Sequence, residues 1–128
     1  MRSESPPSVL VVDDDELMTL LICHILNSNG FETSSAPDGR EGMRQAWLRS
    51  FDLFVFDQMM PGMLGIEVAQ QLTLQGRASR DRIILITAGP VPVRANDYVS
   101  RVMRKPFEMT ELLTELQLMI GRDAPPAV

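Results

Sequence analysis

Several residue types are scarce in this sequence, and each scarcity excludes a class of protein. The 128-residue chain has one cysteine, Cys23, so it cannot form an internal disulfide, which fits a reducing compartment. Twelve basic residues stand against 17 acidic ones, a net charge of −5, which argues against a sequence-independent grip on nucleic acid. No apolar run approaches the roughly 18 residues that a membrane-spanning helix needs. Residues 1–7 lack the apolar core of a signal peptide, so we expect a cytoplasmic protein with no nucleic-acid or membrane partner.

The composition that remains is that of a globular domain. Apolar residues make up 45% of the chain, which excludes a disordered protein, and the length suits one domain. Strand and helix patterns alternate along it. We predict strands at about residues 8–12, 31–35, 53–56, 83–86 and 99–103, and helices at about 15–28, 38–49, 64–75 and 107–120. We expect the domain to occupy residues 8–121, between a disordered arm at 1–7 and a tail at 122–128.

The central strands are apolar without interruption. The run from Leu53 to Phe56 is typical of a strand that is buried on both faces. Together with the β-α alternation, it predicts an α/β fold: a parallel sheet with helices on both faces. A closed eight-fold barrel would need about twice this length. In the first helix we expect one broad apolar face to pack against the sheet; it comprises Leu17, Leu20, Leu21, Ile25 and Ser28, widened by Met18, Ile22 and Leu26. In the second helix we expect Met43, Ala46 and Trp47 to face inward.

Polar residues follow four of the predicted strands. They are Asp13 and Asp14 after the first strand, Asp57 after the third, Thr87 after the fourth and Lys105 after the fifth. In an open α/β sheet these ends share one edge, where ligands bind. Two carboxylates about 4 Å apart repel by roughly 4 kcal/mol at an effective dielectric near 20, so three gathered acids need a compensating cation such as Mg²⁺. With an ammonium and a hydroxyl alongside, this set suits a phosphoryl group on Asp57.

Simpler interpretations exist for single residues. Asp13 or Asp14 could merely cap the following helix, although their company with Asp57 argues against capping alone. His24 has no second ligand at metal-binding spacing, so it is interpreted as a solvated or packed residue. Cys23 is interpreted as a small core residue.

Four motifs together resemble the receiver domain of two-component response regulators, such as the bacterial chemotaxis regulator. They are the segment 9–15 (VLVVDDD), Asp57 with Met60-Pro61-Gly62, Ile86-Thr87-Ala88, and Lys105-Pro106-Phe107. Each motif is weak alone, but in this order they are specific, and they cover about residues 8–120. The resemblance implies a flavodoxin-like, doubly wound, five-stranded parallel sheet in the order 2-1-3-4-5. It also implies a Lys105–Pro106 bond that is commonly cis.

The resemblance also implies roles for the residues at the strand ends. Asp57 would accept a phosphoryl group from a sensor histidine kinase or a histidine phosphotransfer protein, and Thr87 and Lys105 would bind that group. The domain would then change its binding to an unknown downstream protein. It would assist its own Mg²⁺-dependent phosphorylation and dephosphorylation without being an enzyme.

Mg²⁺ is the cofactor that the resemblance implies. Asp14 and Asp57 would ligate it directly, together with the backbone carbonyl of Met59, while Asp13 would act through a water molecule. A phosphatase or mutase with an aspartyl nucleophile would carry a second acid two residues after the nucleophile. Met59 occupies that position, which disfavours such an enzyme.

Two departures from the family concern the output of the signal. Receivers usually carry Tyr or Phe three positions before the lysine, whereas this chain has Val102 there and its single tyrosine, Tyr98, four residues earlier. The threonine and the lysine lie 18 positions apart, roughly one helical turn fewer than the resemblance implies. Because Pro90 and Pro92 would break a helix there, we predict a short or irregular fourth helix and a signal carried by loop rearrangement. The alternative is a pseudo-receiver that acts as a constitutive interaction module.

Overall fold

The computed structural model describes residues 5–121, and five strands form one parallel sheet within them. The strands are β1 (Ser8–Val12), β2 (Glu32–Ala36), β3 (Leu53–Asp57), β4 (Ile83–Thr87) and β5 (Arg101–Arg104). Their spatial order is β2-β1-β3-β4-β5, which confirms the doubly wound order 2-1-3-4-5. Residues 1–4 of the expected arm and the expected tail at 122–128 lie outside the described residues.

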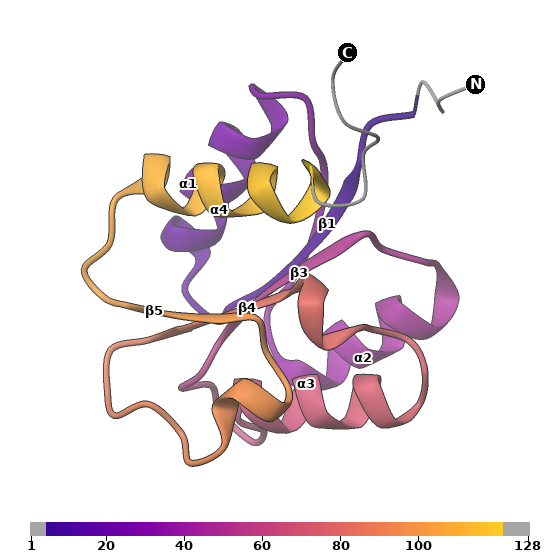
Figure 1. The fold of residues 1–128 in the computed structure, drawn as a ribbon, viewed down its shortest axis with the longest axis vertical. Coiled ribbons are helices and arrows are strands. Elements are labelled where there is room, and N and C mark those ends of the chain that lie inside the picture. Colours follow the sequence, from indigo (N-terminus) through magenta and orange to yellow (C-terminus); the bar gives the residue numbers. More distant parts are fainter. Residues whose placement is uncertain (1–4, 122–128) are drawn as a thin grey trace.

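Four α-helices cover the two faces of this sheet. They are α1 (Glu16–Asn27), α2 (Gly39–Leu48), α3 (Gly65–Leu74) and α4 (Met109–Gly121). Seen nearly edge-on, the sheet separates α1 and α4 from α2 and α3 (Figure 1). None of the described helices has the length and apolarity needed to cross a membrane.

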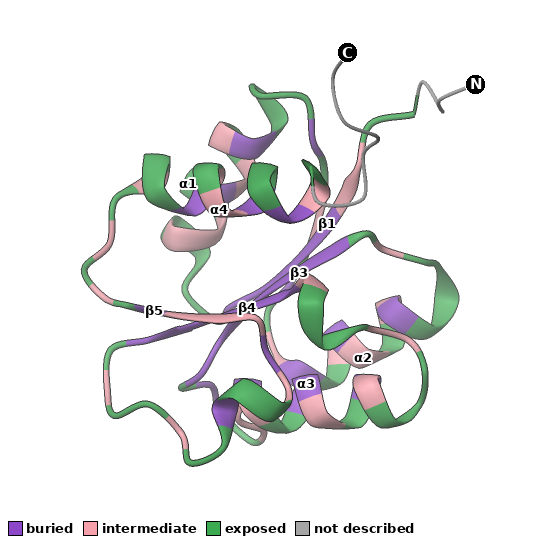
Figure 2. Cartoon of the chain, in the orientation of Figure 1, coloured by how far each residue is buried: buried purple, intermediate pink, exposed green. Residues whose placement is uncertain are grey.

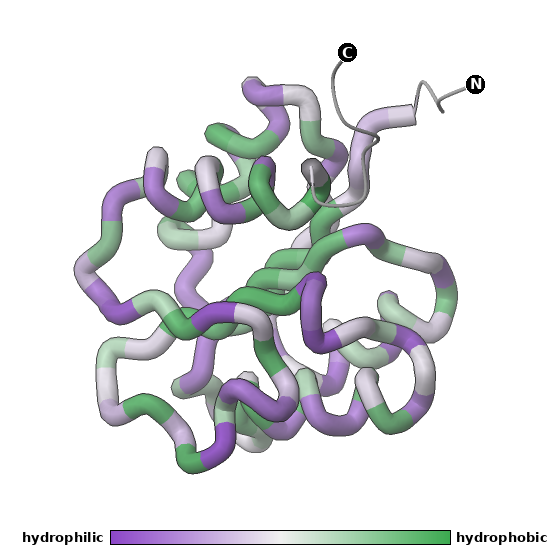
Figure 3. Tube along the Cα trace, viewed as in Figure 1, coloured by the Kyte–Doolittle hydropathy of each residue, from purple (hydrophilic) through white to green (hydrophobic). Residues whose placement is uncertain are grey.

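The core is divided by the sheet into two apolar layers. Alternate side chains of β3 enter opposite layers: Phe54 and Phe56 pack on the side of α2 and α3, whereas Leu53 and Val55 pack on the side of α1 and α4. The first four residues of β3 and of β4 are buried, as their uninterrupted apolar runs predict, and the polar residues that end these strands are buried as well. The central strands are accordingly the most continuously buried and most hydrophobic part of the fold (Figures 2 and 3).

The main stripe of the predicted inward face of α1 was wrong, whereas two of the residues predicted to widen it are the buried ones. Leu17, Leu20 and Leu21 are 66%, 67% and 48% exposed, while Ile22 and Leu26 are fully buried. Apolar residues surround nearly the whole circumference of this helix, but the sheet can cover only one side of it. Periodicity alone therefore could not tell which side faces the core, and an apolar patch remains on the surface.

Trp47 also lies on the surface rather than against the sheet. Its indole N–H donates to Oε1 of Gln75 at 2.8 Å, and the guanidinium of Arg77 lies 5.1 Å from the ring centroid. Ala46, which was also predicted to face inward, is buried on α2, and Met43 packs against the same layer, so the prediction fails for Trp47 alone. The Trp47 ring therefore connects α2 to the loop after α3. It does so through its N–H group and through its contact with the guanidinium of Arg77.

The segment between β4 and β5 is irregular, as the two prolines predict. Its only regular element among the described residues is one 3₁₀ turn, Ala95–Asp97, so α4 is the helix that follows β5. Ala95 and Val99 are buried against the layer that contains α3. A single turn thus replaces a full helix over this part of the sheet (Figure 1).

Replacing Gly42 with alanine should destabilise the fold. An added Cβ would lie 2.7 Å from Cγ2 of Val12, a fully buried side chain with no room to retreat. Overpacking costs about 1–3 kcal/mol, which on balance outweighs the roughly 1 kcal/mol that alanine gains in helix propensity. Urea unfolding should show a lower midpoint, whereas Gly121→Ala, with nothing within 4 Å of the added Cβ, should have a midpoint at or above that of the parent chain. Equal midpoints for both variants would contradict the close packing of α2 on β1.

Candidate functional site

The carboxyl ends of the strands bring the predicted site residues to one edge of the sheet. Asp13 and Asp14 follow β1, Asp57 ends β3, Thr87 ends β4 and Lys105 follows β5. Carboxylate oxygens of the three aspartates all lie within 4.8 Å of one another. The Nζ atom of Lys105 lies 3.2 Å from Oδ1 of Asp57. The geometry thus assembles a triad of acids with one ammonium, from residues far apart in the sequence.

Helix capping accounts for neither Asp13 nor Asp14. The N-cap of α1 is Asp15, whose Oδ1 accepts from the backbone N–H groups of Leu17 at 3.0 Å and Met18 at 3.1 Å. Asp13 is buried and turns back, accepting from the N–H of Asp15 at 2.9 Å. The carboxylate of Asp14 is exposed and makes no hydrogen bond within the described residues. Both acids therefore keep oxygens available for a ligand.

Burial and mutual repulsion perturb the acids. Burial, together with the charge of Asp57, raises the pKa of Asp13 to about 6, against a hydrogen bond from the backbone of Asp15 that lowers it. Burial also raises the pKa of Asp57, although the ammonium of Lys105 partly offsets this. Lys105 is the only lysine in the chain, and one ammonium does not balance three carboxylates. An oxygen-only donor set that is short of positive charge fits Mg²⁺, for which these acids would supply the ligands.

Two residues that sequence reasoning missed shape this edge. At Gly65, a Cβ would lie 2.3 Å from the backbone oxygen of Asp57, so only glycine lets α3 start this close to the strand end. Gln58 is 6% exposed, and its backbone N–H donates to the carbonyl of Ile86 at 2.8 Å. The proline and glycine between β3 and α3 predict a loop. No feature of the sequence, however, indicates that Gln58 or Gly65 makes these contacts.

The ends of β4 and β5 are joined next to the acids. The N–H of Lys105 donates to the carbonyl of Thr87 at 2.8 Å, and the Lys105–Pro106 bond is cis, as the resemblance implied. Thr87 is fully buried, and its Oγ1 accepts from the N–H of Gly89 at 3.1 Å. The hydroxyl therefore already binds the first residues of the irregular segment.

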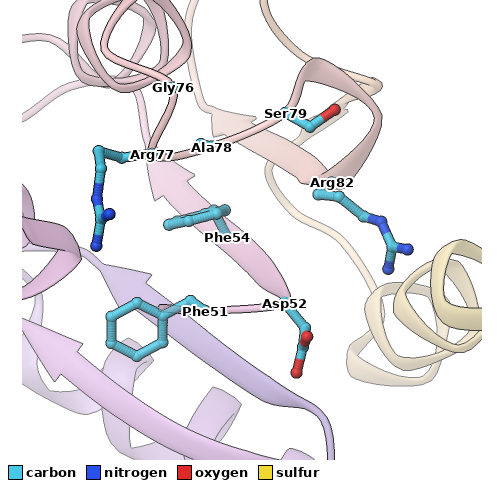
Figure 4. Close-up of a pocket in the computed structure, with 8 residues that line it drawn as sticks. All are labelled: Phe51, Asp52, Phe54, Gly76, Arg77, Ala78, Ser79 and Arg82. Carbon is cyan, nitrogen blue, oxygen red and sulfur yellow. The ribbon is translucent and has the colours of Figure 1, made fainter. Parts of the chain in front are cut away.

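A separate cavity of about 350 Å³ lies at the opposite edge of the sheet, before β3 and β4 (Figure 4). Its lining includes Phe51, Phe54, Arg77 and Arg82. Arg77 is held there by donating from Nε and Nη2 to the carbonyl of Ala46 at 3.0 and 2.8 Å. The cavity contains none of the clustered carboxylates, so the site described above remains the candidate.

Comparison with known proteins identifies the family. The model of the response regulator receiver domain matches residues 9–117. The chain belongs to this family. Among curated relatives, it is 33% identical to the phosphate regulon transcriptional regulatory protein PhoB of Rhizobium meliloti, covering 93% of the chain and 54% of that protein. It is 35% identical to the protein PetR of Rhodobacter capsulatus, covering 95% and 52%. The receiver domain thus spans about half the length of the curated relatives it matches.

Solved receiver structures share the fold. The receiver domain of the Francisella response regulator 1452 superposes with a TM-score of 0.84 at 27% identity, covering 92% of this chain and 99% of that one. The Vibrio cholerae chemotaxis response regulator CheY4 gives 0.81 at 29% identity, covering 89% and 98%. These comparisons confirm the architecture expected from the sequence motifs.

Mg²⁺ should stabilise the domain more at about pH 7.5 than at about pH 5. Folding raises the pKa of Asp13 from 3.8 to about 6, so between pH 3.8 and about pH 6 the folded state binds more protons than the unfolded state. The stability that this acid contributes therefore falls as the pH rises through that range. A cation requires the deprotonated acids, so its affinity should weaken by up to about tenfold per pH unit below this pKa. Thermal unfolding with and without Mg²⁺ measures the difference. In Asp13→Asn the stabilisation by Mg²⁺ should be similar at both pH values. An equal stabilisation at both pH values in the parent domain would contradict Asp13 as part of the Mg²⁺ site.

Proposed function

We propose that this receiver domain accepts a phosphoryl group on Asp57, delivered by a sensor histidine kinase or a histidine phosphotransfer protein. One observation carries the proposal: a carboxylate that is 5% exposed lies 3.2 Å from an ammonium and within 4.8 Å of two further acids. Such a carboxylate is poised to bind an electrophile whose oxygens need positive charge around them. Membership of the family supports the same chemistry.

In the proposed transfer, an oxygen of Asp57 attacks the phosphorus of a phosphohistidine. The P–N bond breaks, its electrons return to the leaving imidazole, and an acyl phosphate forms on Asp57. Lys105 stabilises the charge on the phosphoryl oxygens through its ammonium, and the hydroxyl of Thr87 donates to one of them. Mg²⁺, held by Asp13, Asp14, Asp57 and the backbone carbonyl of Met59, would supply the remaining positive charge. The Thermotoga maritima response regulator TrrA, 28% identical over 88% of this chain with a TM-score of 0.79, was solved in complex with Mg²⁺ and BeF.

The exposed leucines of α1 suit the approach of a phosphoryl donor. Leu20 lines a cavity of about 420 Å³ together with Asp13, Asp14 and Pro37, so an apolar patch and the acids are contiguous. Contiguous exposed apolar surface marks protein contacts, and a partner helix that carries a histidine would bury it. We therefore place the donor on the N-terminal half of α1.

The alternative is a constitutive interaction module that is never phosphorylated. Such a module would have no need for buried acids with raised pKa values or for a lysine beside one of them. The cost of assembling these charges favours the phosphoacceptor.

Phosphoryl donors of low molecular mass should modify the domain at one residue. Incubation with acetyl phosphate and Mg²⁺ should add one phosphoryl group, as measured by intact mass, because the site itself supplies the stabilising charges. Asp57→Asn should remain unmodified, and chelation of Mg²⁺ should prevent the adduct in the parent domain. A domain that stays unmodified under all conditions would favour the constitutive module instead.

We propose that the signal leaves the site through the irregular segment. The Oγ1 of Thr87 now accepts from Gly89, and turning this hydroxyl toward a phosphoryl group would release that N–H. Val102 packs half-buried against the core and has no ring to rotate. Beyond Gly89, a turn closed by the N–H of Ala95 donating to the carbonyl of Pro92 presents Val93, which is 91% exposed.

Beryllofluoride with Mg²⁺ should therefore accelerate hydrogen exchange at the Gly89 amide. The reason is that the hydrogen bond to Thr87 is lost when the hydroxyl binds the phosphoryl mimic. In Thr87→Ala the Gly89 amide should exchange quickly from the start and respond little to the mimic. Unchanged exchange and superimposable structures through residues 88–104 in the parent domain would refute the loop mechanism.

A further inference from the structure

Gln58 is a buried polar side chain that the proposed phosphoryl transfer leaves without a role. It follows Asp57 directly and is 6% exposed, in a position where the apolar strand has just ended. Buried amides are costly unless they form hydrogen bonds. Its contacts therefore indicate what it contributes.

The N-terminus of α3 lacks an N-cap side chain of its own. Leu64 occupies the N-cap position and has no side-chain acceptor, so the first amides of the helix need partners from elsewhere. Gln58 provides two of them. Its backbone carbonyl accepts from the N–H of Gly65 at 3.0 Å, and its side-chain Oε1 accepts from the N–H of Ile66 at 2.8 Å.

A third bond fixes the same residue to the sheet. The backbone N–H of Gln58 donates to Ile86 of β4 at 2.8 Å. One residue thus joins the end of β3, the neighbouring strand and the first turn of α3. The missing side chain of Gly65 permits this contact, since a Cβ there would lie 2.3 Å from the oxygen of Asp57.

The segment that Gln58 closes is the one that carries a metal ligand in the proposed function. Residues 59–64 leave the sheet directly after Gln58 and reach α3 at Gly65. Gln58 is hydrogen-bonded to β4 before this segment and to the first turn of α3 after it. If the side-chain bond were lost, the start of α3 would keep the bond from the N–H of Gly65 to the carbonyl of Gln58 and the bond from the N–H of Leu64 to Oε1 of Glu67 at 2.8 Å, but the Ile66 amide would lose its acceptor. Groups that orient metal ligands without touching the ion commonly govern its affinity.

We infer that Gln58 is a positioning residue for Mg²⁺ binding: by capping α3 with its side chain, it holds the Met59 carbonyl and the Asp57 carboxylate in register. This inference rests on the proposed function. A purely structural cap would lower stability in the same way but would not change the affinity for the ion selectively.

The test is Gln58→Leu, which removes the acceptor but fits the buried position. Isothermal titration should show that this variant binds Mg²⁺ more weakly than the parent domain does, by about tenfold or more. Hydrogen exchange in Mg²⁺-free buffer should be faster at the Ile66 amide, because its only side-chain acceptor is gone. Unchanged Mg²⁺ affinity in a folded Gln58→Leu domain would overturn the inference.

Two further variants separate positioning from general loss of stability. Asn29→Ala removes one neutral bond at another helix end, from Nδ2 to the carbonyl of Ile25 at 2.7 Å, remote from the acids, and should leave Mg²⁺ affinity unchanged. Gln58→Glu retains an acceptor for Ile66 and should restore affinity to within about threefold of the parent, since an acid is favourable at a helix N-terminus. Affinity as weak in Gln58→Glu as in Gln58→Leu, or equally weakened in Asn29→Ala, would refute positioning by the cap. A parent domain that binds no Mg²⁺ would instead overturn the proposed function itself.

Discussion

Repulsion among three clustered acids, two of them buried, is the constraint on which this molecule depends. Oxygens of three aspartates lie within 4.8 Å of one another, and burial raises the pKa of Asp13 and of Asp57. An isolated loop would relax by moving the charges apart. Here they cannot separate, because parallel strands deliver their last residues to one edge and the apolar layers on both faces fix the strands. The free energy of the core thus maintains an arrangement that only a cation or an ammonium can balance.

The strands and their polar ends could be predicted from the sequence for a simple reason. An uninterrupted apolar run has one stable environment, the middle of a covered sheet, and a polar residue that ends it must lie at the edge. Contacts that depend on which way a helix face or a side chain points could not be predicted. The helix α1 is apolar almost all round, so the exposure of Leu17 and Leu20 depends on tertiary packing. Gln58 caps a helix amide eight residues further on, and no local pattern distinguishes such a glutamine from a solvated one.

The irregular segment shows a local pattern that departs from the usual rules. Turn tips are normally polar, yet Val93 is exposed at a turn whose next residue, Arg94, adopts a left-handed conformation with φ of 60°. The guanidinium of Arg94 is paired with Asp97 at 2.7 Å, which helps to hold the turn. Sites where a sequence contradicts local preferences are often sites of function. The position agrees with the proposed output through the backbone of this segment rather than through an aromatic ring.

The single lysine gives the domain an unusual chemical simplicity. Reagents that acylate or methylate amines find one side-chain target in the whole chain, and that nitrogen lies 3.2 Å from Oδ1 of Asp57. An isotope-labelled methyl group or a reactive ester placed there would report on the site with no background from other side chains. The rate at which Lys105 reacts would depend on how strongly Asp57 holds its ammonium group. The reaction rate would therefore measure the strength of this ion pair in the intact protein.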